Sequence, residues 1–217
     1  MSARDTILGA IRTTLGRAAP DADAVAREAQ SLLGDAARFQ PKFDGQTNRA
    51  RFIERATSER LTATVDEVDS LPDAASAIRR YLERCQLPLR VSCPPMPQLR
   101  ELDWCGIATH ETLGANEPVV VNIADWAVAE TGSLVFASRP ENPTLYNFLP
   151  LHHIILLDGA RILRYPEDYW RRVHDAGNVH PRSINFITGT SGTADIEAQN
   201  IRGAHGPRFM HIVIFGA

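Results

Sequence analysis

Apolar residues in the first part of the chain recur at the spacing of amphipathic helices. Residues 3–16 carry them at intervals of three and four, which predicts a helix that stops at Gly16. A second helix is predicted over residues 21–33, with an aspartate at its start and Gly34 after its last apolar residues. Residues 38–45, which include a proline and a glycine, are typical of a linker. The sequence therefore predicts an N-terminal helical arm over residues 1–40 and a domain over residues 41–217.

Beyond the linker, helix and strand patterns alternate. The predicted helices cover residues 48–60, 72–85, 167–174 and 193–202, and the predicted strands cover residues 61–65, 87–91, 119–123, 133–137, 153–158, 183–188 and 209–215. Several of these strands are too uniformly apolar to have one face in water, which favours a sheet covered on both faces. The pattern predicts an α/β fold with a mostly parallel, doubly wound sheet.

Composition narrows the classes of partner. The chain has 217 residues, of which 44% are hydrophobic and 23% charged, so it can bury a sizeable core. Its 23 basic and 26 acidic side chains give a net charge of -3, which argues against binding to nucleic acid or to an anionic membrane surface. Apolar runs such as residues 154–157 are too short to span a bilayer. The N-terminus lacks the apolar core of a signal peptide, so we expect a cytoplasmic protein without a membrane span.

The cysteines and histidines do not form a metal-binding pattern. Cys85, Cys93 and Cys105 are separated by seven and eleven residues, which matches neither a disulfide framework nor an iron–sulfur or zinc motif. The seven histidines include no HExxH or comparable ligand spacing. We expect no metal and no cofactor in this chain, so iron for any redox chemistry would lie in another protein.

The sharpest local signal is a candidate anion-binding loop. A predicted strand ends at Thr188, a loop rich in Gly, Ser and Thr follows, and a predicted helix begins near Thr193. Free backbone N–H groups and the dipole at a helix N-terminus favour a phosphate or carboxylate. The candidate ligand-binding residues of this segment are Gly189, Thr190, Ser191, Gly192, Thr193 and Asp195, and Thr131 and Gly132 are candidates for the same ligand. The alternative is that these residues only cap the helix and form the turn.

Two further side chains are candidates for catalysis. Glu130 precedes Thr131 and Gly132 just before a predicted strand, where a carboxylate could act as a base or nucleophile and glycine permits close backbone approach. The alternative is a glutamate that ends a short helix. His205 lies in a loop between a predicted helix and the last strand, where functional groups concentrate in this architecture, although a lone histidine is more often structural. His152 and His153 are expected on opposite faces of one strand.

Four segments in order resemble the lactate-utilization protein C family, whose members consist largely of one LUD domain. They are AETGSLVFAS, LPLHHIILLD, ITGTSGTADIE and GAHGPRFMHIVIFG. The family pattern falls on Glu130, Thr131, Gly132, His153, Gly189, Ser191, Thr193, Ala194, Asp195, Glu197, Gly203, His205, Gly206 and Pro207. Thr190 and Gly192 depart from it, because relatives show a proline and a basic residue there, and this removes a cation from the candidate anion loop.

The resemblance implies both a fold and a role. The fold would be similar to that of sugar-phosphate isomerases and CoA transferases. The role would be that of an accessory or regulatory subunit beside iron–sulfur partners that oxidise L-lactate to pyruvate. Two alternatives stay open: a stand-alone isomerase-like or transferase-like enzyme with Glu130 as base or nucleophile, and a sensor. Either would bind a small anionic metabolite, phosphorylated or CoA-linked, at residues 189–193.

Overall fold

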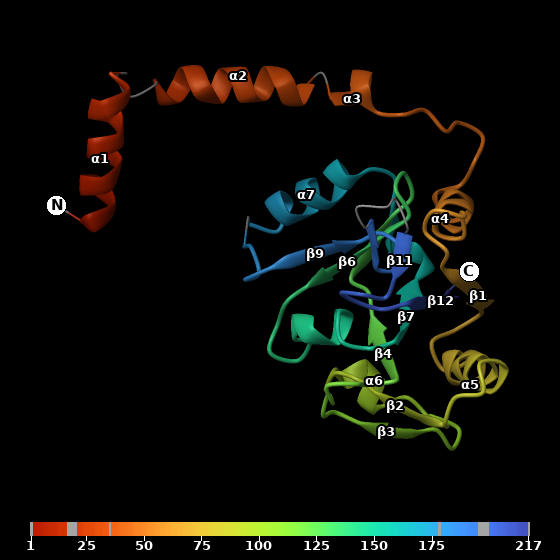
Figure 1. Cartoon of the computed structure of the whole chain (residues 1–217). Helices are drawn as coiled ribbons and strands as arrows, with labels where there is room; N and C mark the ends of the chain where they lie inside the picture. The colour runs from red at the N-terminus through yellow and green to blue at the C-terminus, as the bar shows by residue number, and fades with distance from the viewer. Residues whose placement is uncertain (1, 17–20, 35, 178, 195–199, 217) are drawn as a thin grey trace. The chain divides into compact units, whose positions relative to one another are not determined.

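The computed structural model describes residues 2–16, 21–34, 36–177, 179–194 and 200–216 (Figure 1). It divides the chain into two compact units, Met1–Lys42 and Phe43–Ala217. None of the helices in the described ranges is long and apolar enough to cross a membrane.

The first unit is helical. Helix α1 covers Ala3–Leu15 and begins with a reciprocal cap, in which the Asp5 N–H donates to Ser2 Oγ and the Ser2 N–H donates to the Asp5 carboxylate. Gly16 ends it in the left-handed conformation, with φ of 58°. Helix α2 covers Ala22–Gly34 and α3 covers Ala36–Phe39. Both long helices were predicted from the spacing of apolar residues. The apolar side chains of α1 are exposed, namely Ile7, Leu8, Ile11 and Leu15.

The second unit is built on a six-stranded parallel sheet with the order β1-β12-β7-β4-β2-β3. Its strands are β1 Thr64–Val68, β2 Arg90–Ser92, β3 Ala108–His110, β4 Val119–Ile123, β7 His152–Asp158 and β12 Phe209–Phe215. The α/β fold with a mostly parallel sheet is confirmed. Strands β4, β7 and β12, which are mostly apolar, lie next to one another in the centre of the sheet, where both faces are covered.

Side chains alternate between two cores on the two faces of this sheet. On one face, helices α5 Ala74–Arg84 and α6 Pro97–Arg100 pack against the strands, with Ile78 and Leu82 of α5 beside Ile154 of β7. On the other face, Phe52 of helix α4 Asn48–Ala56 and Phe136 of a second sheet pack beside Ile155. Neighbouring residues of one strand thus enter different cores, as strand geometry requires.

The second sheet has the order β8-β5-β6-β9. Its strands are β5 Trp126–Val128, β6 Ser133–Ala137, β8 Ile162–Leu163 and β9 Ile184–Ile187. Strand β6 pairs antiparallel with β5 and with β9. The sequence predicted β6 and β9 as strands, but it did not separate them from the parallel sheet. Only four residues connect β5 to β6, too few for a parallel crossover, so the pair forms a hairpin. Helix α7 Pro166–Asp175, also predicted, packs through Tyr169 beside Leu163 of this sheet.

The helix predicted over residues 193–202 is wrong. The described residues form two short antiparallel strands instead, β10 Gly192–Ala194 and β11 Asn200–Arg202, with Thr193 opposite Ile201. β-Branched residues suit such a strand pair better than a helix. Two hydrogen bonds fix its start, from Ser191 N–H to the Pro207 carbonyl and from Gly203 N–H to the Ser191 carbonyl. The helix N-terminus on which the anion loop was predicted is therefore replaced by a strand.

Candidate functional site

The segments of the family signature meet at the amino edge of the parallel sheet, around the residues that lead into β1. Gly189 has φ of 79°, and a Cβ there would lie 2.7 Å from the Leu61 Cα. Gly132 has φ of 73°, and its Cβ would lie 2.9 Å from the Arg55 Cβ and 3.0 Å from Leu61 Cδ1. Both positions need glycine for backbone conformation and for close packing against the same segment. These two glycines bring the 130–133 turn and the 188–192 loop together.

A chain of hydroxyl groups connects the same two segments. The Thr131 hydroxyl lies 2.7 Å from that of Ser133, which lies 2.6 Å from that of Thr188. Thr190 is tied to the residues before β1, because its N–H donates to the Leu61 carbonyl at 3.1 Å and its hydroxyl lies 2.9 Å from that of Thr62. The hydroxyls therefore bond to one another and hold the loop in place.

Ser191 and His205 line one small cavity. Its volume is about 250 Å³, and its walls come from Asn147, Phe148, Ile187, Thr188, Gly189, Thr190, Ser191, Gly192, His205, Gly206, Pro207 and Met210. A Cβ on Gly206 would lie 3.2 Å from that of Ser191, so the two loops are in close contact. The imidazole of His205 is exposed. Gly192 and Thr193 belong to β10, and Asp195 lies outside the described residues.

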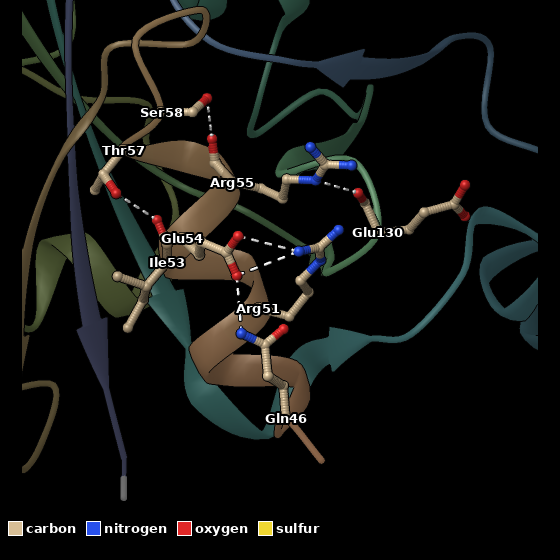
Figure 2. Close-up of polar contacts among 8 residues, drawn as sticks. All are labelled: Gln46, Arg51, Ile53, Glu54, Arg55, Thr57, Ser58 and Glu130. Atoms are coloured by element: carbon tan, nitrogen blue, oxygen red, sulfur yellow. Dashed lines mark hydrogen bonds and ion pairs between the residues drawn. The ribbon is translucent and has the colours of Figure 1, made fainter. Parts of the chain in front are cut away.

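Glu130 is not part of this cavity. Its N–H donates to the Arg164 carbonyl at 3.1 Å, and its carbonyl accepts from Arg55 Nε at 3.1 Å. Figure 2 shows that Glu130 meets Arg55 through this carbonyl, while its carboxylate extends away from α4. Burial and, to a smaller extent, the nearby Glu167 raise the pKa of Glu130. The structure thus brings Ser191 and His205 together and leaves the Glu130 carboxylate apart from them.

A second cavity lies on the other side of Thr190, and its chemistry was not predicted. Thr62, Arg202, Arg208 and Phe209 line a volume of about 440 Å³. Arg202 Nη1 donates to the Thr62 hydroxyl and, at 3.4 Å, to that of Thr190. The 190–192 loop carries no cation of its own. The signal was the pair of arginines that flank the GAHGP segment.

The largest cavity that we describe, about 570 Å³, lies at the opposite, carboxyl edge of the sheet. Its wall includes Ile123, Asp158 and Phe215, the last residues of β4, β7 and β12. Both arginines of this cavity have a carboxylate partner among the described residues. Asp125 accepts hydrogen bonds from Arg139 and from the Ala137 N–H, and Asp158 lies 3.7 Å from Arg161 Nε.

The two neighbouring histidines lie on opposite faces of β7, as the alternation predicted. His152 is hydrogen-bonded to the Tyr81 hydroxyl at 2.9 Å and stacks on Phe209 at 4.4 Å between ring centroids. His153 is fully buried beside Phe136, and neither ring nitrogen has a hydrogen-bond partner among the described residues. Burial lowers the pKa of His153 to about 3, so the imidazole is neutral. The described residues contain no group of three or more His, Cys, Asp and Glu that could hold a metal ion.

Comparison with known proteins shows what these segments are similar to. The model of the LUD domain matches residues 119–215. The chain is 33% identical over 109 residues to lactate utilization protein C of Geobacillus kaustophilus, covering 48% of this chain and 45% of the relative. It is 32% identical over 98 residues to lactate utilization protein C of Halalkalibacterium halodurans, covering 43% of each. The matched region thus spans a little under half the length of these relatives.

One crystal structure shares the fold. A DUF162 family protein from Deinococcus radiodurans superposes with a TM-score of 0.59 over 79% of this chain and 100% of that chain, at 19% identity. Residues 119–215 contain β4 to β12 and all of the predicted signature except its last residue, Gly216. Residues 119–215 therefore match the LUD domain, and the predicted resemblance to the lactate utilization protein C family is confirmed.

Proposed function

We propose that this chain acts in lactate utilization, as an accessory or regulatory subunit of an iron–sulfur system that oxidises L-lactate to pyruvate. The similarity of residues 119–215 to relatives named lactate utilization protein C supports the process. The iron–sulfur clusters would lie in partner subunits, because Cys85, Cys93 and Cys105 lack cluster-ligand spacing.

The arrangement of the candidate catalytic residues favours a role as a subunit over a role as an enzyme. A nucleophile or base must lie within hydrogen-bond reach of the group on which it acts. Ser191 and His205 share a cavity that Glu130 does not line, and the Glu130 carboxylate extends away from α4 (Figure 2). Glu130 is therefore not among the residues that would surround a ligand in that cavity.

Helix α1 offers a surface for a partner. Ile7 is 60% and Leu15 62% exposed, and α1 has no buried residue. Contiguous exposed apolar side chains on a polar helix are typical of protein interaction sites. We propose that this stripe contacts an iron–sulfur subunit.

The test is affinity purification of the tagged full chain from its native cells grown on L-lactate, with mass spectrometry and iron determination on the eluate. We expect stoichiometric iron–sulfur proteins with the natural chain and with Thr13→Ala, which changes a polar position of α1. We expect their loss with the double variant Ile7→Ser/Ile11→Ser. Recovery of the natural chain alone and free of iron would contradict the proposal.

A second candidate function is supported by the cavity between Arg202 and Arg208. Two guanidinium groups beside the 188–192 loop favour a chain that binds a small anionic metabolite, as a sensor or as a stand-alone isomerase-like or transferase-like enzyme. The variant Glu130→Gln distinguishes the enzyme from the sensor. It should abolish turnover if the chain is an enzyme, and it should leave binding of the metabolite unchanged if the chain is a sensor.

A further inference from the structure

We infer that the cavity lined by Thr62, Arg202, Arg208 and Phe209, here called the arginine cavity, binds a small oxyanion through its two guanidinium groups. The ligand class is a carboxylate or a phosphate group on a small body. This inference deepens the second candidate function and rests on it, and it does not require an iron–sulfur partner.

The charge of the arginine cavity is the first observation. Among the described residues, which exclude 195–199, no carboxylate lies within 4.0 Å of either guanidinium, whereas most arginines at other edges of the domain have one. Arg49, for example, lies 2.6 Å from Glu67, and Arg164 lies 3.1 Å from Asp44. Two positive charges therefore line one concave space without a negative partner among the residues that the structure describes. An anion that enters would gain charge-assisted hydrogen bonds to both.

Arg202 is held in place by neutral groups. Its Nη1 donates to the hydroxyls of Thr62 and Thr190, and its Nη2 donates to the Glu59 carbonyl at 3.2 Å. These three bonds orient the guanidinium without neutralising its charge. They involve only the two terminal nitrogens, so Nε–H and one further N–H remain as donors. Such a fixed fork matches the two oxygens of a carboxylate or phosphate, and less side-chain entropy is lost on binding.

The backbone beside Arg202 is held in a costly conformation. Thr62 has φ of 59°, a region that a β-branched residue seldom adopts and that costs of order 1–3 kcal/mol. Its N–H donates to the Ser58 carbonyl at 2.8 Å, and its hydroxyl bonds to Thr190 and Arg202. This conformation is what places the Thr62 hydroxyl under the guanidinium.

The remaining wall of the arginine cavity is aromatic. The ring of Phe209 is 43% exposed, is stacked on His152 from behind at 4.4 Å, and has the Arg208 guanidinium 5.5 Å from its centroid. An aromatic surface next to two cations suits a ligand with a charged head and a short apolar body. The side chain that stacks behind it keeps the ring in position.

The test is isothermal titration of the purified full chain with L-lactate, pyruvate and inorganic phosphate at low ionic strength. We expect saturable binding of at least one probe. Arg208→Gln and Arg202→Gln should each weaken it by about tenfold or more, as expected for losing one charge-assisted hydrogen bond. Arg139→Gln is the matched control, since it removes the same charge at the carboxyl edge, and should leave the affinity unchanged. The probe that binds with the highest affinity shows whether the oxyanion is a carboxylate or a phosphate.

Three results would overturn the inference: no saturable binding of any probe, undiminished binding by a folded Arg208→Gln variant, or equal weakening by Arg139→Gln. Arg208 makes no hydrogen bond through its side chain among the described residues, so Arg208→Gln should fold even if Arg202→Gln does not; thermal unfolding checks this. The titration uses the isolated chain. A chain that binds an anion without co-purifying partners would therefore separate this inference from the accessory-subunit proposal.

Discussion

The two edges of the parallel sheet differ in how they use charge. At the carboxyl edge, where open α/β sheets usually hold their ligands, the cavity is the larger one, but Asp125 is paired with Arg139 and Asp158 lies near Arg161. At the amino edge the cavities are smaller, and Arg202 and Arg208 have no carboxylate partner among the described residues. The larger cavity is therefore not the one that is lined by arginines without a described carboxylate partner.

The largest effect is expected from Gly189→Ala, which should disrupt the packing of the 188–192 loop against Leu61 at the amino edge of the sheet. The new Cβ would lie 2.7 Å from the Leu61 Cα in a left-handed backbone, and we expect a loss of roughly 3–5 kcal/mol in the free energy of unfolding. Gly177→Ala is the control, since it has φ of 90° and nothing within 4 Å, and should cost only about 1 kcal/mol. Urea unfolding followed by circular dichroism measures both, and equal losses would refute the close packing at Leu61.

The next largest effect is a loss of stability in mild acid, which we expect two buried histidines to cause. Burial lowers the pKa of His153 to about 3 and that of His211 to about 4. Between these values and about pH 6.5, the unfolded chain binds more protons than the folded one, so stability falls as the pH falls, by about 1.4 kcal/mol per pH unit for each histidine. Above pH 6.5 this contribution is complete.

His153→Leu isolates one of these histidines. Both of its ring nitrogens lack partners among the described residues, so we expect the variant to be at least as stable at pH 7 and to lose stability less steeply below pH 6.5. His174→Gln changes an exposed histidine and should leave the slope unchanged. Urea midpoints between pH 5 and 7 measure this. An unchanged slope in His153→Leu would contradict the assignment.

A smaller effect is expected at the carboxyl edge from Asp125→Ala. This change removes the acceptor of the Ala137 N–H and the partner of Arg139, and should cost about 1–3 kcal/mol in stability. Glu141→Ala, an exposed residue of the same cavity, should cost less than about 0.5 kcal/mol. Neither should alter anion binding in the arginine cavity. Weaker binding by the Asp125 variant would show that the two edges are not independent.

The smallest effect is expected from Glu130→Gln. Its carboxylate has no hydrogen bond or ion pair among the described residues, and burial raises its pKa, which disfavours the charged form in the folded chain. The change should therefore alter stability by less than about 0.5 kcal/mol at pH 7, toward greater stability. Thermal unfolding measures it. A marked loss would mean that the carboxylate supports the 130–133 turn.

The elements that the sequence predicted are those whose signal is local and repeated. The central residues of strands such as β7 and β12 are mostly apolar because both faces of the sheet are covered, and helix α1 has evenly spaced apolar residues. The prediction of a helix over residues 193–202 was wrong because it rested on capping and turn-forming residues, which suit a strand pair equally well. The hydrogen bonds of Ser191 with Pro207 and Gly203 favour the strand pair over the helix, and a local sequence pattern gives no information about such contacts.

The site was predictable only in part for the same reason. Residues 188–192 and 205–207 come together as loops, and their composition showed where to look. The arginine cavity depends on the pairing of β12 with β1, which brings Arg202 beside Thr62, 140 residues earlier in the chain. That contact follows from sheet topology, and spacing along the sequence does not encode it.

The pairing of β1 with β12 also bears on where this protein can be divided. The matched LUD segment begins at residue 119, so it includes β12 but not the strand that covers one side of it from Thr64 to Val68. A fragment cut at that boundary would carry a long apolar strand with bare N–H and C=O groups along one side, which invites pairing with another copy. The smallest stable piece of this protein must therefore keep β1, which lies outside the segment that matches the LUD domain.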